Sequence, residues 1–197
     1  MNRMRLFFIV FVLMSFPIII YGQRRNSISI EASYDYGIRV PLYGIGGVAS
    51  YDILEKGHWT AGAGLGLKHI DTFLGQGEAG GVWSRQNEWV MPVFARLGFN
   101  YGVGFFHLDA GYNFNLHSKT PENNVKTNNY AISGFYFSPT IGVRIAKVVY
   151  LSASVTWMQK HRNSESKYVY DPDGVHILLA TVKEFTPTAK LALGVRF

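Results

Sequence analysis

The sequence of 197 residues contains no cysteine. This absence excludes a disulfide framework and also the cysteine through which lipoproteins are anchored. Long hydrophobic runs are scarce, since the apolar stretch from Leu6 to Ile20 is shorter than the roughly 20 residues of a membrane-spanning helix. Clusters of lysine and arginine with interleaved aromatic residues are missing too, so we expect no nucleic-acid partner. The chain must be held together by its own secondary structure.

The amino terminus has the order of a secretory signal. Arg3 and Arg5 precede the apolar run, and Gly22 offers a small residue at its end. We therefore expect residues 1–22 to be a cleaved signal peptide and residues 23–197 to form one domain. Loss of the two arginines lowers the formal net charge from +6 to +4.

Most of the remaining chain alternates between apolar and polar residues. Successive side chains of a strand point to opposite faces, so strict alternation predicts half-buried β-strands rather than helices. A polar, glycine-rich segment at 71–87 and a segment at 117–129 with Pro121, four asparagines and no apolar pattern are interpreted as loops. The predicted strands cover residues 27–40, 43–54, 58–70, 88–100, 106–116 and 130–145, followed by two strands that form a hairpin from 149 to 197.

The last hairpin allows a prediction of register. Asp171-Pro172-Asp173-Gly174 has the sequence of a three-residue hairpin loop that pairs Asp171 with Val175. This register sets Val149 opposite Phe197 and keeps apolar residues on one face. It makes each arm about twice as long as the 9–11 residues that cross a bilayer. The excess, from residue 162 to 183, should project as a two-stranded ribbon.

Glycine recurs on one face of the strand predicted at 58–70. Gly62, Gly64 and Gly66 alternate with apolar residues, although glycine normally weakens a strand. We interpret this face as a place where large side chains of neighbouring strands need room. A phosphate-binding loop is a poor alternative, because the chain has no GK[ST] motif and no following helix there.

The chain ends in Leu193-Gly194-Val195-Arg196-Phe197, an amphipathic strand that finishes on an aromatic residue. With eight strands and alternating short and long connections, it resembles the small eight-stranded outer-membrane proteins of the OmpA/OmpX type, catalogued as porin-family barrels. The resemblance implies an antiparallel up-and-down transmembrane β-barrel in the bacterial outer membrane. It also implies that the barrel assembly machinery reads Leu193, Val195 and Phe197, and that the protein serves envelope structure or surface interaction.

An eight-stranded barrel encloses an interior that side chains can fill. The inward positions carry both charge signs, and buried charges are tolerated when they are paired. We therefore predict a plugged lumen, in which His107 and Asp109 form a hydrogen-bonded pair rather than a metal site, and we expect no cofactor. The predicted lumen network comprises Glu31, Asp35, Arg39, Asp52, Lys68, Glu88, Arg96, His107, Asp109, Arg144, Lys190 and Arg196.

Aromatic residues fall near both ends of the predicted strands, as a membrane interface favours. Trp59 and Tyr101, with Tyr150, should lie at the inner rim, and Trp89 and Trp157 at the outer rim. The expected partners are outer-membrane lipid and lipopolysaccharide, the assembly machinery, and an extracellular partner bound by the loops.

Other classes of function are also compatible with parts of the sequence. Lipid A deacylases resemble such barrels, and His117-Ser118 and His161 with Ser164 and Glu165 lie near outer strand ends. A serine nucleophile needs a base within hydrogen-bond reach, and the surrounding sequence does not match the deacylase pattern. We therefore expect no enzyme. A narrow ion path and a soluble, exported lipocalin-like binder are the remaining alternatives.

Overall fold

The computed structural model describes residues 27–39, 41–74, 84–119, 130–171 and 174–197. The predicted signal peptide lies outside these residues. No helix in the described part of the chain has the length and apolar character to cross a membrane. All regular structure is β, in eight strands: β1 (Ser27–Gly37), β2 (Leu42–Lys56), β3 (Trp59–Leu74), β4 (Ser84–Tyr101), β5 (Gly104–Lys119), β6 (Tyr130–Arg144), β7 (Val149–Asp171) and β8 (Gly174–Arg196).

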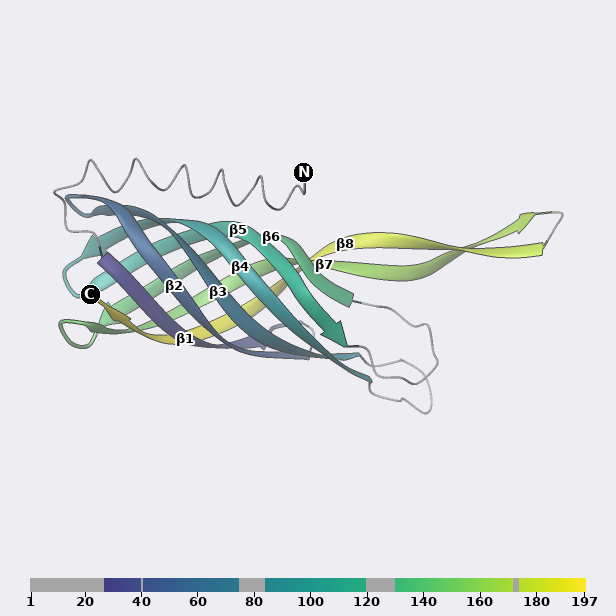
Figure 1. The fold of residues 1–197 in the computed structure, drawn as a ribbon, viewed down its shortest axis with the longest axis horizontal. Helices are drawn as coiled ribbons and strands as arrows, with labels where there is room; N and C mark the ends of the chain where they lie inside the picture. Colours follow the sequence, from purple (N-terminus) through teal and green to yellow (C-terminus); the bar gives the residue numbers. More distant parts are fainter. Residues whose placement is uncertain (1–26, 40, 75–83, 120–129, 172–173) are drawn as a thin grey trace, which may run out of the picture.

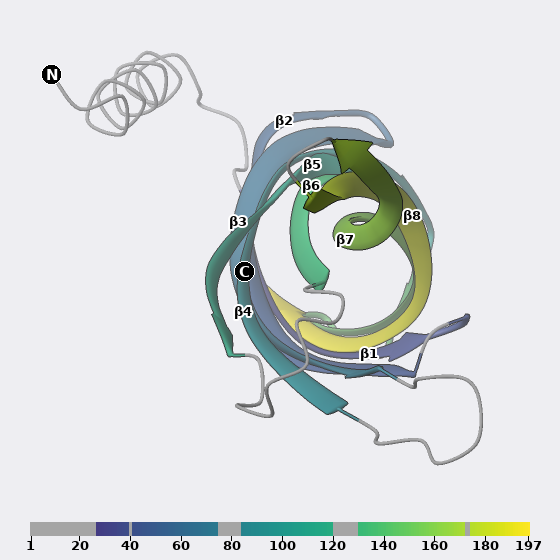
Figure 2. The ribbon, with the colours of Figure 1, turned by 90° about the vertical axis from the view of Figure 1, so that its right-hand side faces the viewer.

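The eight strands form one closed antiparallel barrel in which each strand pairs with its neighbours in sequence. The cylinder closes where β1 pairs with β8, with Ser29 opposite Arg196 and Gly37 opposite Thr188. Figure 1 shows the tilted strands from the side, and Figure 2 shows the ring of strands from the end that carries the ribbon. The predicted fold class and strand count are confirmed.

Burial follows the alternation of the sequence. Every second residue of β1 is buried inside the barrel and its neighbours are exposed on the outer surface. The exposed positions carry large apolar side chains such as Ile30, Leu65 and Ile141, whereas the buried ones include many charged and hydroxyl side chains. This is the inverse of a soluble barrel, and it is the pattern of strands that cross a lipid bilayer.

The two ends of the barrel differ in the length of their connections. Short turns join β2 to β3, β4 to β5 and β6 to β7 at the end that holds Phe197 (Figure 1). Gly57 and Gly102 take positive φ angles of 62° and 59° in the first two turns, which favour glycine. At the opposite end the strands extend further, and β7 and β8 extend furthest (Figure 1).

Three strands extend into segments that were predicted as loops. β3 continues to Leu74 and β4 begins at Ser84, so part of the segment expected as a loop forms a ladder, with Asp71 opposite Asn87. β5 likewise continues to Lys119. Polar residues concealed these extensions, because a strand that rises above a bilayer no longer needs an apolar outer face.

The predicted register of the last hairpin is wrong by two residues. Asp171 pairs with Gly174 rather than Val175, and a bulge between Glu165 and Lys167 shifts the ladder once more. Val149 consequently lies opposite Val195, not Phe197. Because the total shift is even, residues below the bulge stay on the faces that the predicted register gives them.

The strands β7 and β8 leave the barrel together as a ribbon (Figure 1). The last pair between β6 and β7 is Tyr130 with Arg162, and β1 leaves β8 after Thr188, apart from one hydrogen bond from Ile38 N to Pro187 O of 3.1 Å. Within the described residues, the ladder from 163 to 171 pairs only with residues of β8. The projecting ribbon that the sequence predicts is therefore present.

Candidate functional site

The centre of the lumen is organised around Arg96 of β4. Its Nε and Nη2 atoms bind both carboxylate oxygens of Asp109 on β5, at 2.7 and 2.9 Å. Nη2 also lies 3.2 Å from Oε1 of Glu31 on β1, and Nη1 donates to Ser50 on β2 at 2.9 Å. The guanidinium is buried and thus joins four strands across the barrel through a bidentate ion pair and two further contacts.

Glu31 extends this network to the strands on the other wall. The Tyr150 hydroxyl of β7 donates to Oε1 of Glu31 at 3.0 Å, and Nζ of Lys190 on β8 lies 3.5 Å from Oε2. Arg96, Asp109, Glu31, Tyr150 and Lys190 are all buried. Opposite charges therefore meet in the interior, as buried charge requires.

Further ion pairs lie on both sides of this centre. On the ribbon side, Lys68 contacts both oxygens of Asp35 at 2.9 and 3.0 Å. On the side of the short turns, Arg196 contacts Asp52 at 2.9 Å, and the half-buried Arg144 donates to the amide oxygen of Asn100 at 2.8 Å. The lumen is thus charged along most of its length.

The ribbon end of the lumen is capped by apolar side chains that the sequence did not predict there. Leu42, Ile70, Val90, Ile132 and Met158 are almost completely buried and belong to one hydrophobic cluster. They occupy inward positions of five different strands. The alternation of each strand could therefore have predicted that these apolar side chains point into the lumen. The cap closes the end that faces the ribbon.

Glu88 lies buried at this capped end. Its Oε1 atom accepts hydrogen bonds from Asn115 Nδ2 at 2.8 Å, Gln86 Nε2 at 3.3 Å and the main-chain N–H of Ile132 at 3.2 Å. Lys160 is also buried here, and its Nζ atom has no hydrogen-bond partner within the described residues. Three donors on a single oxygen hold the Glu88 side chain in place.

Aromatic rings fill the space that inward glycines leave open. A Cβ atom on Gly64 would collide with the ring of Phe94, and one on Gly142 with the ring of Phe105. Gly194 makes the same room for Tyr150. The predicted role of the β3 glycines, to make room for large side chains of neighbouring strands, therefore holds for Gly64. The prediction that Tyr150 belongs to the aromatic residues of the inner rim is wrong, because its side chain points into the lumen.

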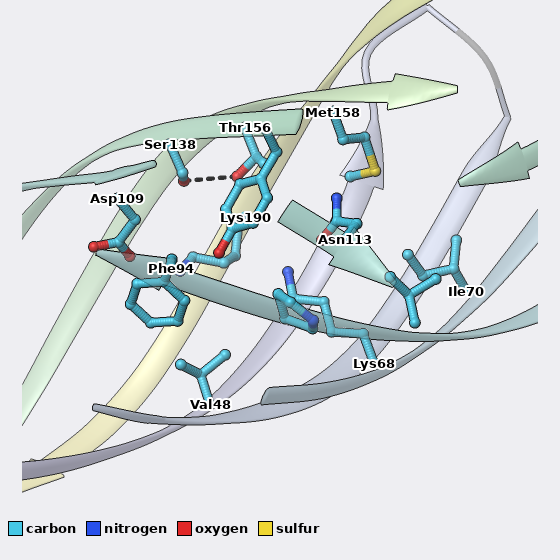
Figure 3. Close-up of a pocket in the computed structure, with 13 residues that line it drawn as sticks. Val48, Lys68, Ile70, Phe94, Asp109, Asn113, Ser138, Thr156, Met158 and Lys190 are labelled. Carbon is cyan, nitrogen blue, oxygen red and sulfur yellow. Dashed lines mark hydrogen bonds between the residues drawn. The ribbon is translucent and has the colours of Figure 1, made fainter. Parts of the chain in front are cut away.

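The space between the central network and the apolar cap is small. A cavity of about 30 Å³ lies between the central network and the apolar cap, and side chains from opposite walls, among them Lys68, Asn113 and Lys190, surround it (Figure 3). A hydrogen bond of 2.7 Å between Ser138 and Thr156 closes one side. Such a volume has room for one or two water molecules but not for a continuous path.

Two residues of the predicted network are placed differently. Arg39 is exposed and not in the lumen, because β1 ends at Gly37 and the chain bends before Pro41. His107 is buried inside but does not bind Asp109, whose two oxygens are taken by Arg96. Its ring instead packs against Phe105, with centroids 4.6 Å apart.

The predicted interface aromatics lie on the outer surface. Trp59 and Tyr101 are exposed at the end with the short turns, and Trp89 is exposed toward the ribbon end. Trp157 stacks on Phe137 with ring centroids 4.8 Å apart and an angle of 9°. Tryptophan and tyrosine near both ends of an apolar surface match the two interfaces of a bilayer.

The closed cylinder thus combines a charged interior, an apolar exterior and an aromatic belt near each end. The fold is that of an eight-stranded transmembrane β-barrel. No protein-family model and no curated protein matches the chain.

Solved structures of similar barrels share the architecture at low sequence identity. The N-terminal β-barrel domain of Pseudomonas aeruginosa OprF is 12% identical, with coverage of 87% of this chain and 97% of that one and a TM-score of 0.47. Ail of Yersinia pestis in a nanodisc is 13% identical, with 88% and 100% coverage and a TM-score of 0.44. A major outer membrane protein of Thermus thermophilus is 12% identical, with 88% and 100% coverage and a TM-score of 0.36. The likeness is one of architecture alone.

The residues considered for a lipid A enzyme do not meet in this barrel. His117 pairs with Trp89 on the outer face, while Ser118 pairs with the inward Glu88. The Ser118 hydroxyl accepts a hydrogen bond from Gln86 Nε2 at 2.9 Å. Adjacent residues of a strand point to opposite faces, so His117 is not placed to activate Ser118. The side chains of Ser164 and Glu165 lie outside the described residues.

Proposed function

We propose that the protein is an integral barrel of the bacterial outer membrane that is closed to solutes and carries the β7–β8 ribbon outward for surface interaction. The observation that carries the proposal is the ribbon itself, because β7 and β8 are 23 residues long each, about twice what a bilayer requires. A barrel with a purely structural role in the membrane would need no strands that extend beyond the bilayer.

The orientation follows from the connections. In bacterial barrels the short turns face the periplasm and the long extensions face outward. The predicted amino-terminal signal peptide would supply the export that this location needs, and Leu193, Val195 and Phe197 lie at the closing strand, where the assembly machinery would engage the chain. Leu193 and Phe197 are exposed on the outer surface.

The absence of native cysteine makes this orientation easy to test. A single cysteine in place of His176, in the ribbon, should react with a membrane-impermeant maleimide on intact cells. A single cysteine in place of Lys147, in the exposed turn after β6, should react only after the outer membrane is permeabilised. Labelling of both sites on intact cells, or of Lys147→Cys alone, would contradict the proposed orientation.

A surface role depends on the free edges of the ribbon. Unpaired strand edges present rows of N–H and C=O groups that can pair with another polypeptide. Replacing residues 163–181 with Asn-Gly joins the paired residues Arg162 and Val182 in a tight hairpin turn. Cells that carry this variant should lose most of their retention on immobilised basement-membrane extract relative to cells with the full-length protein.

The barrel itself provides the control for the shortened ribbon. The variant should keep the heat-dependent gel mobility of a closed barrel, because the removed residues pair only with each other within the described residues. Unchanged retention of cells that carry the folded variant would refute the surface role while leaving the barrel intact. We assign the protein no catalytic role and no conducting path.

A further inference from the structure

The register of the ribbon base brings two basic residues face to face. His161 of β7 and Lys183 of β8 are direct partners across the ladder. The inward neighbours Lys160 and Thr186 are buried, so alternation places His161 and Lys183 on the outer face. Lys183 is exposed and His161 is half-exposed. Both side chains thus offer N–H donors on the surface that faces lipid.

The height of this pair on the barrel is set by the aromatic residues below it. Trp157 lies opposite Pro187 and Gln159 opposite Phe185. His161 is four residues beyond Trp157, which corresponds to about 13 Å along a strand. Tryptophan marks the boundary of the hydrocarbon region. Because the strands of a barrel are tilted, the height above this boundary is smaller than that length, and it places the basic pair at the level of lipid headgroups.

The surroundings of the pair leave its donors uncompensated. The outward residues of the two strands at this height include no acid, namely Trp157, Gln159, His161, Lys183, Phe185 and Pro187. Glu184 points to the other face, opposite Lys160. Arg39 lies beside the same strand, because Ile38 N donates to Pro187 O, and it is exposed. A third basic residue, Arg39, thus lies on the chain segment beside the base of β8.

We propose that His161 and Lys183, together with Arg39 of the neighbouring strand end, bind a phosphate of a phosphorylated glycolipid in the outer leaflet. Phosphate oxygens accept several hydrogen bonds at once, and charge-assisted bonds of this kind are the strong ones. The acyl chains of the same lipid would lie against Phe185, Trp157 and Phe137, directly below. This inference rests on the proposed outer-membrane location and specifies the lipid-binding site within it.

The test uses the full-length protein folded in detergent micelles. Bis-phosphorylated lipid A is titrated and the bound lipid is measured by native mass spectrometry. Removing one donor with Lys183→Gln should weaken binding by about tenfold, and His161→Gln/Lys183→Gln should weaken it further. Lys183→Arg should retain binding, because arginine supplies the same charge and more donors.

Matched controls separate this site from general attraction to a basic protein. Lys147→Gln removes an exposed lysine at the opposite end of the barrel and should bind lipid A as the wild type does. Dephosphorylated lipid A should bind weakly to all variants, and inorganic phosphate alone should not compete at equal concentration. Equal binding of lipid A by the double variant and the wild type would overturn the proposed site, as would full binding of the dephosphorylated lipid.

Failure of this inference is distinguishable from failure of the proposed function. Heat-dependent gel mobility and the labelling of His176→Cys on intact cells report the barrel and its orientation independently of lipid binding. If those two hold while lipid A binding does not depend on His161 and Lys183, only the phosphate site is refuted.

Discussion

Replacing Arg96 with methionine should lower the free energy of unfolding by about 3–5 kcal/mol, the range for breaking a buried ion pair. The substitution leaves Glu31 and Asp109 in the lumen without the guanidinium that they share. Glu31 keeps its contact with Lys190, but Asp109 loses the hydrogen bonds to both of its oxygens. Urea titration of the protein folded in lipid vesicles, followed by gel mobility, measures the change.

Two further variants make this prediction specific. Arg144→Met removes an arginine that is only half-buried and donates to a neutral amide, so its cost should stay near ~1 kcal/mol. Adding Glu31→Gln and Asp109→Asn to Arg96→Met removes the uncompensated charges and should restore much of the loss. An Arg96→Met variant as stable as the wild type would show that the central network does not support the barrel.

Replacing Gly64 with valine should destabilise the barrel by about 1–3 kcal/mol or prevent its folding, because overpacking forces neighbours out of place. The new Cβ atom would collide with the ring of Phe94 and approach the carbonyl oxygen of Ala49 to 2.8 Å. The same urea titration reports the effect. Phe94→Leu in the Gly64→Val background should recover part of it, since the smaller side chain vacates the space above position 64.

Gly47 supplies the matched control for Gly64. It lies on the outer face of the neighbouring strand β2, and a Cβ atom there would meet only Glu31 O at an ordinary 3.7 Å. Gly47→Val should therefore leave stability unchanged or raise it slightly, because valine favours strands. Equal losses at the two positions would mean that strand glycines matter for their backbone and not for the space above them.

The alternation of the sequence was sufficient to predict the strand count and most faces. Each strand buries one face, and side chains alternate between the two faces, so the apolar and polar pattern determines which residues lie on which face. Local irregularities escaped the prediction, because bulges depend on the partner strand. Those between Asp52 and Leu54 and between Trp89 and Val90 have no distinctive sequence. One residue of the register error in the last hairpin also comes from a bulge, between Glu165 and Lys167, and the other comes from the turn itself.

The sequence predicted which residues point into the lumen, but it predicted less well which of them contact one another. Parity identified Glu31, Arg96 and Asp109 as inward residues, yet it could not say which acid would hold the arginine. Asp109 was expected to bind His107, two residues away on the same strand. It binds Arg96 instead, because the two residues are cross-strand partners of the β4–β5 ladder. Register, which parity does not supply, decides such contacts.

The β6–β7 ladder shows how a single glycine accommodates one of these irregularities. Register shifts between Ile132 and Tyr136, and Gly134 within this interval has a φ of 124°. The side chain of Gln159 fills the space next to it, and its Oε1 atom accepts a hydrogen bond from Phe135 N at 3.2 Å. A residue with a Cβ atom would be strained there and would displace Gln159.

The central network also bears on the order in which the barrel forms. Arg96 and Asp109 are 13 residues apart and can pair as soon as the β4–β5 hairpin closes. Glu31 and Lys190 are 159 residues apart, so their contact must await the meeting of the first and last strands, which is the slowest kind of contact to form. Until then Glu31 lacks Lys190 and Tyr150, and only Arg96 of β4 is available to it. The network thus favours a complete barrel over a partly inserted one, since Glu31 has both of its cations only when the cylinder is closed.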